Sequence, residues 1–96
     1  MTSALGSVSA EPSAGYDVYG SSKAALNRLM RGYAVRAGAG RTLLLVMPGW
    51  VKTDMGGDEA PLEVETSVRG IADAVAARSG TAGLTFIDYR NAVLPW

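Results

Sequence analysis

Cysteine and histidine are both absent from this sequence. Their absence excludes a disulfide framework, thiolate chemistry, a structural zinc site and a Ser-His-Asp triad by residue type alone. Long apolar runs are missing too: the longest, Leu43 to Pro48, is far shorter than the roughly 20 residues that cross a bilayer. The first residues also lack the basic and apolar regions of a signal peptide. We therefore expect a cytoplasmic protein that is not embedded in a membrane.

An excess of charge of either sign is missing as well. Nine basic residues are scattered among nine acidic ones, so the formal net charge is zero. A basic stripe that would suit a nucleic acid or an anionic membrane surface is therefore not expected. Because cysteine and histidine are absent, a bound metal is not expected either. With 96 residues, of which 48% are hydrophobic, the sequence fits one small globular domain and not a disordered tail.

The most informative stretch is Tyr19-Gly20-Ser21-Ser22-Lys23, a Tyr-x-x-x-Lys step at the start of a helical pattern. Residues four apart share one face of a helix, so the phenol and the ammonium can point into the same space. A free phenol has a pKa of about 10, and a neighbouring ammonium favours its charged form, which makes such a pair suitable for acid-base chemistry. The spacing alone also fits an amphipathic helix with a packed tyrosine and a solvated lysine.

The pattern around this step predicts a loop followed by a helix. Residues Met1 to Asp17 are rich in serine, alanine and glycine and show no sustained period, which is typical of a loop. A helix is predicted from Val18 to about Arg36, with Asp17 as its N-cap and Gly38 as its stop. Its apolar residues recur at helical spacing, while four polar residues fall mainly on other faces. The apolar set is Ala25, Leu26, Leu29, Met30 and Tyr33, and the polar set is Asn27, Arg28, Arg31 and Arg36.

A strand is predicted next, from Arg41 to Met47, because its apolar residues run without alternation between Gly40 and Pro48. Such a run is typical of a parallel sheet that is covered on both faces. The loop from Pro48 to Pro61 then leaves the carboxyl end of the strand, which is where ligands bind in open α/β sheets. By itself, Pro48-Gly49 also fits an ordinary turn.

The remaining third predicts a second helix and a second strand. Val64, Val68, Ile71, Ala72 and Val75 form one apolar stripe, the face expected to pack on the sheet. Glu65 and Arg69 form a stabilising pair four residues apart. The helix ends at Ser79-Gly80, Leu84 to Ile87 reads as a short strand, and Asp88 to Trp96 reads as a tail that turns back over the site. This order is that of the end of a doubly wound α/β domain.

Several motifs occur together and in a fixed order. They are Ser3-Ala4-Leu5-Gly6-Ser7, Ser21-Ser22-Lys23-Ala24-Ala25-Leu26-Asn27, Pro48-Gly49-Trp50-Val51-Lys52-Thr53-Asp54-Met55, Asp88-Tyr89 and Leu94-Pro95-Trp96. With Tyr19 they resemble the C-terminal half of a short-chain dehydrogenase/reductase, closest to the small carbonyl reductases and the C-factor-like members. The resemblance implies an α/β fold: the C-terminal half of a doubly wound Rossmann-type parallel sheet, in helix-strand-helix-strand order. Residues 1–96 would be one part of a single domain and incomplete alone.

The resemblance also implies reversible hydride transfer between a nicotinamide ring and a small carbonyl or alcohol substrate. Tyr19 would supply the proton, Ser3 would bond the same oxygen, and Lys23 would assist Tyr19 and bind the nicotinamide ribose. Trp50 and Trp96 would help to shape the substrate pocket. The implied cofactor-binding residues are Tyr19, Lys23, Pro48, Gly49, Trp50, Val51 and Thr53.

Other hydroxyl groups lie near these positions, namely Tyr16, Ser7, Ser21 and Ser22. We prefer Tyr19 because it alone has a lysine four residues on. We prefer Ser3 because it opens Ser-x-x-Gly in the matching place. Ketones, aldehydes, quinones and pteridine-like carbonyls all fit such a site.

Two parts of the family pattern have no counterpart here. A glycine-rich turn that leads from a first strand into a helix, where the pyrophosphate binds, is not found. The family's additional catalytic asparagine and the strand before Ser3 are also missing, the strand being at most a stub. We therefore expect a fragment that is inactive alone, with NADP or NAD bound through the missing half. The alternative is a non-enzymatic interaction fragment, which forms a homo-oligomer or associates with a full-length relative.

Overall fold

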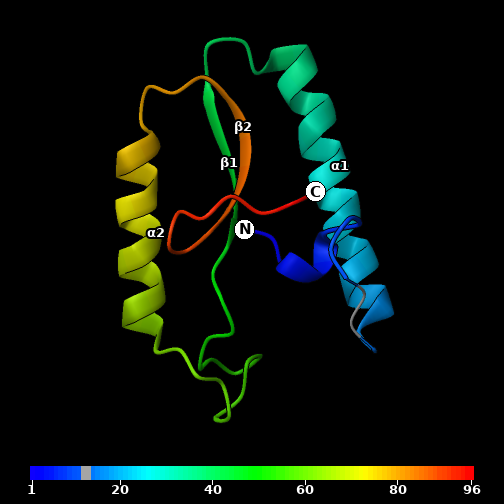
Figure 1. Cartoon of the computed structure of the whole chain (residues 1–96), viewed down its shortest axis with the longest axis vertical. Helices are drawn as coiled ribbons and strands as arrows, with labels where there is room; N and C mark the ends of the chain where they lie inside the picture. Colours follow the sequence, from blue (N-terminus) through cyan, green and yellow to red (C-terminus); the bar gives the residue numbers. More distant parts are fainter. Residues whose placement is uncertain (12–13) are drawn as a thin grey trace.

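The computed structural model describes residues 1–11 and 14–96. The chain forms a short 3-10 turn η1 (Ala4–Gly6), helix α1 (Asp17–Ala37), strand β1 (Thr42–Met47), helix α2 (Val64–Arg78) and strand β2 (Gly83–Asp88). The two strands lie between the helices, with α1 on one side and α2 on the other (Figure 1). The predicted α/β class and helix-strand-helix-strand order are confirmed. Neither helix in the described ranges is long and apolar enough to cross a bilayer.

The two strands pair in parallel, from Thr42 opposite Gly83 to Met47 opposite Asp88. Both predicted strands are confirmed, with ends that differ from the prediction by one residue. Side chains alternate between the faces of a sheet, and Val46 and Ile87 point toward α2, where they pack with Ala74. Leu45 and Phe86, which are opposite each other in the register, point to the other face and are 2% and 1% exposed. Both faces of the sheet are thus covered, as the apolar run predicts.

Helix α2 packs on the sheet through a face that differs from the predicted one. Ser67 and Ala74 are each 2% exposed, and Ile71 packs against the core. The predicted valine stripe lies largely in solvent, since Val64, Val68 and Val75 are 48%, 58% and 49% exposed and Ala72 is exposed too. That part of the prediction was wrong for the valines, although Ile71 does pack inward; at Gly70 the chain approaches α2 too closely for any side chain. A Cβ on Gly70 would lie 2.5 Å from the Tyr89 carbonyl oxygen.

Helix α1 begins one residue earlier than predicted. Its N-cap is Tyr16, which has a left-handed backbone (φ 61°) and makes no side-chain capping bond, while Asp17 lies in the first turn. The prediction of Asp17 as N-cap was therefore wrong, although its carboxylate still lies at the positive end of the helix dipole. The predicted end is confirmed: the helix stops at Ala37, and the N–H of Gly38 donates to the Ala34 carbonyl at 3.0 Å.

The inner face of α1 also differs from the prediction. Leu29 is 68% exposed, and Ala25 is exposed as well. Asn27, predicted on an outer face, is 5% exposed and is the buried residue of the helix. Its partners lie in the first residues of the chain, and helical periodicity carries no information about such contacts.

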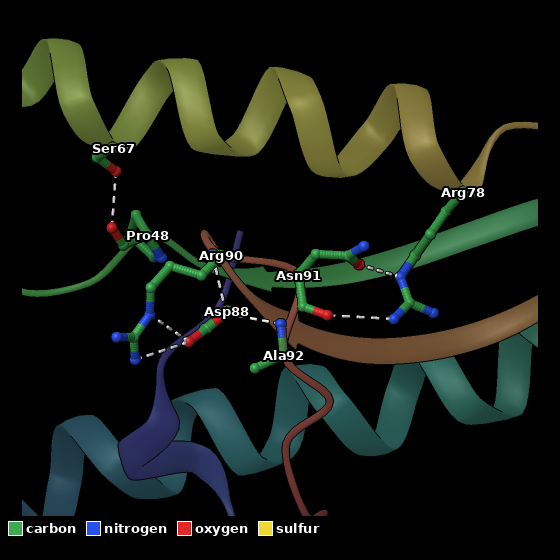
Figure 2. Close-up of polar contacts among 7 residues, drawn as sticks. All are labelled: Pro48, Ser67, Arg78, Asp88, Arg90, Asn91 and Ala92. Atoms are coloured by element: carbon green, nitrogen blue, oxygen red, sulfur yellow. Dashed lines mark hydrogen bonds and ion pairs between the residues drawn. The ribbon is translucent and has the colours of Figure 1, made fainter.

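The two ends of the described chain run along the edges of the strand pair. The Thr2 N–H donates to the Val46 carbonyl at 2.8 Å, so the first residues lie beside β1, but they form no strand. The tail runs back along β2, where the Leu94 N–H donates to the Phe86 carbonyl at 2.9 Å. The turn between β2 and the tail is closed by the Asp88 carboxylate, which accepts bonds from the Arg90 and Ala92 N–H groups (Figure 2).

Candidate active site

The carboxyl ends of both strands and the first turns of both helices lie at the same end of the molecule (Figure 1). This arrangement follows from parallel strands joined by helices that run in the opposite direction. It brings the start of α1, which carries Tyr19 and Lys23, to the end where β1 leads into the Pro48 segment. Open α/β sheets bind their ligands at this end.

Ser3 is the N-cap of η1 and has an extended backbone. Its Oγ accepts a 3.2 Å hydrogen bond from the Leu5 N–H. A serine hydroxyl has one proton to donate besides its two acceptor lone pairs. Because the bond to Leu5 uses only an acceptor site, the Ser3 proton is free to be donated to another oxygen.

Tyr19 and Lys23 lie on one face of α1, as their spacing predicts. The Lys23 Nζ is 5.4 Å from the centroid of the Tyr19 ring, a distance at which an ammonium interacts with an aromatic face. Tyr19 is 36% exposed, and Lys23 is half-buried. The phenol is therefore accessible from the solvent.

The turn after Ser3 packs directly against this part of α1. A Cβ on Gly6 would lie 2.8 Å from the backbone carbonyl carbon of Lys23. On the helix side, a Cβ on Gly20 would lie 2.8 Å from the Leu5 carbonyl oxygen. Contacts this short require glycine on both sides, so the two backbones can touch only because neither position carries a side chain. The Ser3 turn and the Tyr19-Lys23 pair are thus held together.

Thr2 and Asn27 add a buried polar link between the same two segments. The Thr2 Oγ1 donates to the Asn27 Oδ1 at 2.7 Å, and the Asn27 Nδ2 donates to the Gly6 carbonyl at 3.3 Å. Sequence reasoning missed both residues. One signal was available for Asn27: it lies four residues after Lys23 and three before Met30, on the same arc of the helix.

The segment predicted to follow the nicotinamide begins at the end of β1. The Pro48 carbonyl accepts a 2.7 Å bond from the Ser67 hydroxyl of α2 (Figure 2). Gly49 has a positive φ of 88°, and Val51 forms a parallel bridge with Leu62. The segment is therefore anchored to the start of α2. Among the described residues, no hydrogen bond or ion pair joins it to Ser3, Tyr19 or Lys23.

Trp50 and Thr53 form a tight turn within this segment. The Trp50 Nε1 donates to the Gly56 carbonyl at 2.8 Å, and the indole is 57% exposed. The Thr53 Oγ1 accepts a 3.0 Å bond from the Gly56 N–H. Thr53 is exposed, so its hydroxyl is accessible to a ligand.

The tail returns to the loop that carries Ser3. The Trp96 carbonyl accepts bonds from the N–H groups of Val8 and Ser9, at 3.0 and 2.8 Å. Its ring lies 5.7 Å from that of Phe86 and 5.1 Å from the Arg31 guanidinium. Arg31 lies two helical turns beyond Lys23, so the Trp96 ring packs along α1 and away from the Tyr19 phenol.

Two described cavities lie away from the Ser3, Tyr19 and Lys23 cluster. One of about 730 Å³ lies between α2 and the turn after β2. Another of about 570 Å³ lies between the arginines of α1 and Trp96. Ser3, Tyr19 and Lys23 line neither of these two cavities.

Comparison with known proteins identifies the family. The sequence model of a family described as Enoyl-(Acyl carrier protein) reductase matches residues 1–83. C-signal of Myxococcus xanthus is 37% identical over 97 residues, which cover 100% of this chain and 58% of that protein.

Two solved structures are similar over the whole chain. A short-chain dehydrogenase/reductase from Burkholderia multivorans with bound NADP is 41% identical, with a TM-score of 0.94, and 42% of its chain is covered. A carbonyl reductase from Pseudomonas aeruginosa PAO1 in complex with NADP is 46% identical, with a TM-score of 0.85 and again 42% covered.

The fold is therefore a Rossmann-type α/β fold. This chain spans less than half the length of these two solved relatives. The chain belongs to the short-chain dehydrogenase/reductase family of oxidoreductases. The resemblance inferred from the sequence motifs is confirmed.

Proposed function

We propose that this chain carries the proton-transfer residues of an NAD(P)-dependent oxidoreductase that interconverts a small carbonyl compound and its alcohol. One observation carries the proposal: the Lys23 Nζ lies over the Tyr19 ring, next to a turn that begins at Ser3. Family membership supports it. In this proposal residues 1–96 are one part of a single Rossmann-type domain, in a cytoplasmic enzyme.

The proposed chemistry requires a hydrogen-bond donor and a proton at the substrate oxygen. When bound, the nicotinamide supplies a hydride to the carbonyl carbon, and the electron pair of the C–O π bond moves onto oxygen. Ser3 stabilises that oxygen with its free O–H, and Tyr19 transfers its phenolic proton to it, which yields the alcohol. In the reverse direction, the Tyr19 oxygen accepts the proton of the alcohol.

Lys23 suits the role of a cofactor-binding cation. Among the described residues, the ion pairs are Lys52–Glu63, Arg69–Glu65 and Arg90–Asp88. No carboxylate there forms an ion pair with the Lys23 ammonium. An ammonium has three donors, which can reach ribose hydroxyls and the Tyr19 oxygen. We further propose that the nicotinamide binds along Pro48, Gly49, Trp50, Val51 and Thr53. There the Thr53 hydroxyl is accessible to the carboxamide or a phosphate oxygen.

We also propose that carbonyl reduction requires residues beyond these 96. This chain spans 42% of the chain of each of the two NADP-bound relatives. In the described residues, the connection from β1 to α2 contains no glycine-rich turn that opens the helix, which is the usual pyrophosphate site. Both relatives bind NADP, and this favours NADP over NAD for the complete enzyme.

A chimera tests the proposal directly. Residues 1–96 replace the matching segment of the Pseudomonas aeruginosa carbonyl reductase, and NADPH oxidation is followed with small ketones and aldehydes. We expect Tyr19→Phe to lower kcat by about a hundredfold or more, the lower range for a lost general acid. Tyr16→Phe is the matched control, because Tyr16 is 74% exposed and lies outside the helix. A chimera that is equally active with Phe at position 19 would refute the assigned role.

The isolated chain provides the second half of the test. We expect it to show no NADPH-dependent carbonyl reduction. Robust reduction by the purified 96-residue chain, lost in Tyr19→Phe, would show that no further residues are needed.

A second candidate function is association with another subunit, either a second copy or a related full-length reductase. It is favoured by the apolar side chains that α1 presents to solvent, since Val18, Leu29 and Val35 are 87%, 68% and 89% exposed. Sedimentation combined with nicotinamide titration separates the two functions. A monodisperse folded species that binds no nicotinamide supports association, and one that binds it supports the enzyme.

A further inference from the structure

Asn27 is a polar side chain placed where α1 would be expected to bury an apolar one. It lies one helical turn after Lys23 and is only 5% exposed. Three of its half-buried neighbours on the helix, Ala24, Leu26 and Met30, are apolar. A buried amide costs free energy unless its hydrogen bonds are made, so packing alone would favour leucine at this position.

Both hydrogen bonds of Asn27 go to residues that flank Ser3. The Oδ1 accepts from the Thr2 hydroxyl at 2.7 Å, directly before Ser3. The Nδ2 donates to the carbonyl of Gly6, the last residue of the turn that Ser3 caps. Thr2 is itself 3% exposed and bonded through its N–H to Val46 of β1.

These contacts fix Ser3 from both sides. A hydroxyl that stabilises a developing charge must be held near its productive position before the reaction, because a small displacement of the donor lowers the reaction rate strongly. In the described residues, the Ser3 side chain makes a single hydrogen bond, which it accepts from the Leu5 N–H. The backbone on either side of it is held to α1 by one amide, which lies on the same helix as Tyr19 and Lys23.

We propose that Asn27 is a positioning residue, which sets the location of Ser3 relative to Tyr19 and Lys23. This rests on the proposed function, in which Ser3 bonds the substrate oxygen. Asn27 touches neither substrate nor cofactor in this proposal and acts only through the Ser3 turn.

Amide hydrogen exchange on the 96-residue chain tests the anchoring without any activity. The reporters are the N–H of Thr2, bonded to Val46, and the N–H of Gly6, bonded to the Ser3 carbonyl. We expect roughly tenfold faster exchange at both in Asn27→Ala and Thr2→Val, from the loss of a buried hydrogen bond. Thr2→Ser keeps the hydroxyl and should retain protection. Unchanged exchange in both Asn27→Ala and Thr2→Val would overturn the proposal.

Two further variants serve as a control and as a replacement for a variant that does not fold. Leu29→Ala alters an exposed side chain of the same helix and should leave both reporters unchanged. If Asn27→Ala does not fold, Asn27→Asp replaces it, because the carboxylate still accepts from Thr2 but cannot donate to Gly6. Faster exchange at Gly6 than at Thr2 is then expected, and equal protection at both would count against the proposal.

Kinetics in the chimera test whether Asn27 acts through Ser3. We expect Asn27→Ala to lower kcat by about tenfold with little change in the KM for NADPH, as for a misplaced transition-state donor. In a Ser3→Ala background, the same change should lower kcat by less than about twofold, because residues that act as a unit are not additive. An equal fall in both backgrounds would show a merely structural role.

The two proposals fail in different ways. If the unmodified chimera shows no reduction that depends on Tyr19, the proposed function fails. The exchange comparison still decides whether Asn27 anchors the Ser3 turn.

Discussion

The hydroxyl of Ser67 donates a 2.7 Å hydrogen bond to the carbonyl of Pro48. This bond joins the first turns of α2 to the end of β1, at the point where the chain leaves the sheet (Figure 2). Ser67 is 2% exposed, so water does not readily replace it. The position of the segment proposed to bind the nicotinamide therefore depends on a residue of α2.

Ser67→Ala is expected to lower the free energy of unfolding by about 1–2 kcal/mol, because the Pro48 carbonyl loses its buried donor. Urea unfolding followed by circular dichroism measures the change. Ser21→Ala in α1 is the control, since Ser21 is exposed and the change in helix propensity is the same. An equal response of the two variants would mean that the bond contributes nothing.

Gly70→Ala should destabilise the chain even though alanine favours a helix. The new Cβ would lie 2.5 Å from the Tyr89 carbonyl oxygen, a backbone atom that cannot turn aside. We expect a loss of about 1–3 kcal/mol, as for overpacked cores. Gly32→Ala in α1 is the matched control: its Cβ would meet only the end of the Arg36 side chain at 3.0 Å. That variant should gain up to about 1 kcal/mol from helix propensity, and denaturant unfolding of both variants measures the opposite signs.

Asn91 combines a left-handed backbone (φ 68°) with bonds to α2. The Arg78 guanidinium donates to its side-chain oxygen and, at 3.3 Å, to its carbonyl (Figure 2). Asn91→Ala removes the side-chain bond and adds a strain of about 1–2 kcal/mol. Asn91→Gly removes the bond but relaxes the backbone, and it should destabilise less. Thermal unfolding ranks the two, and a glycine variant less stable than the alanine variant would contradict this account.

Gly56→Ala addresses the proposed cofactor segment. A Cβ there would lie 1.9 Å from the Val51 carbonyl oxygen, so the turn that holds Trp50 must open. In the chimera we expect the KM for NADPH to rise about tenfold or more, because groups displaced from their binding positions hold the cofactor less tightly. Gly57→Ala is the control: its φ of 77° adds strain, but beyond the adjoining residues no described atom lies within 4 Å of the new Cβ. A smaller rise for position 56 than for position 57 would argue against a role of this turn in cofactor binding.

Much of the fold could be predicted from the sequence because it depends on local signals. The apolar run before Pro48 predicts the buried strand, and the Tyr19-Lys23 spacing predicts a shared helical face, which the structure confirms. The inner faces of the helices could not be predicted in the same way. In α2 the Tyr89 backbone approaches Gly70 closely, a tertiary contact that the periodicity of one helix cannot show.

Asn27 shows the same limit for the site. Its partners Thr2 and Gly6 lie 25 and 21 residues away along the chain. A pattern within one helix cannot show that a polar residue will find partners so distant, and an amide is usually assigned to the solvent face. The location of the Ser3 turn depends on this link and on the glycine contacts, all of which are tertiary.

The hydrogen bonds from the Val8 and Ser9 N–H groups to the Trp96 carbonyl have a consequence for the order in which the chain folds during biosynthesis. Residues 8 and 9 leave the ribosome well before residue 96, their bonding partner, has been made. Until then, the loop downstream of Ser3 lacks this closure, whose entropic cost grows with the length of chain between the joined ends. Helix α1, in contrast, has its backbone hydrogen-bond partners within its own 21 residues. The loop that follows Ser3 is secured only after residue 96 has been translated and released from the exit tunnel.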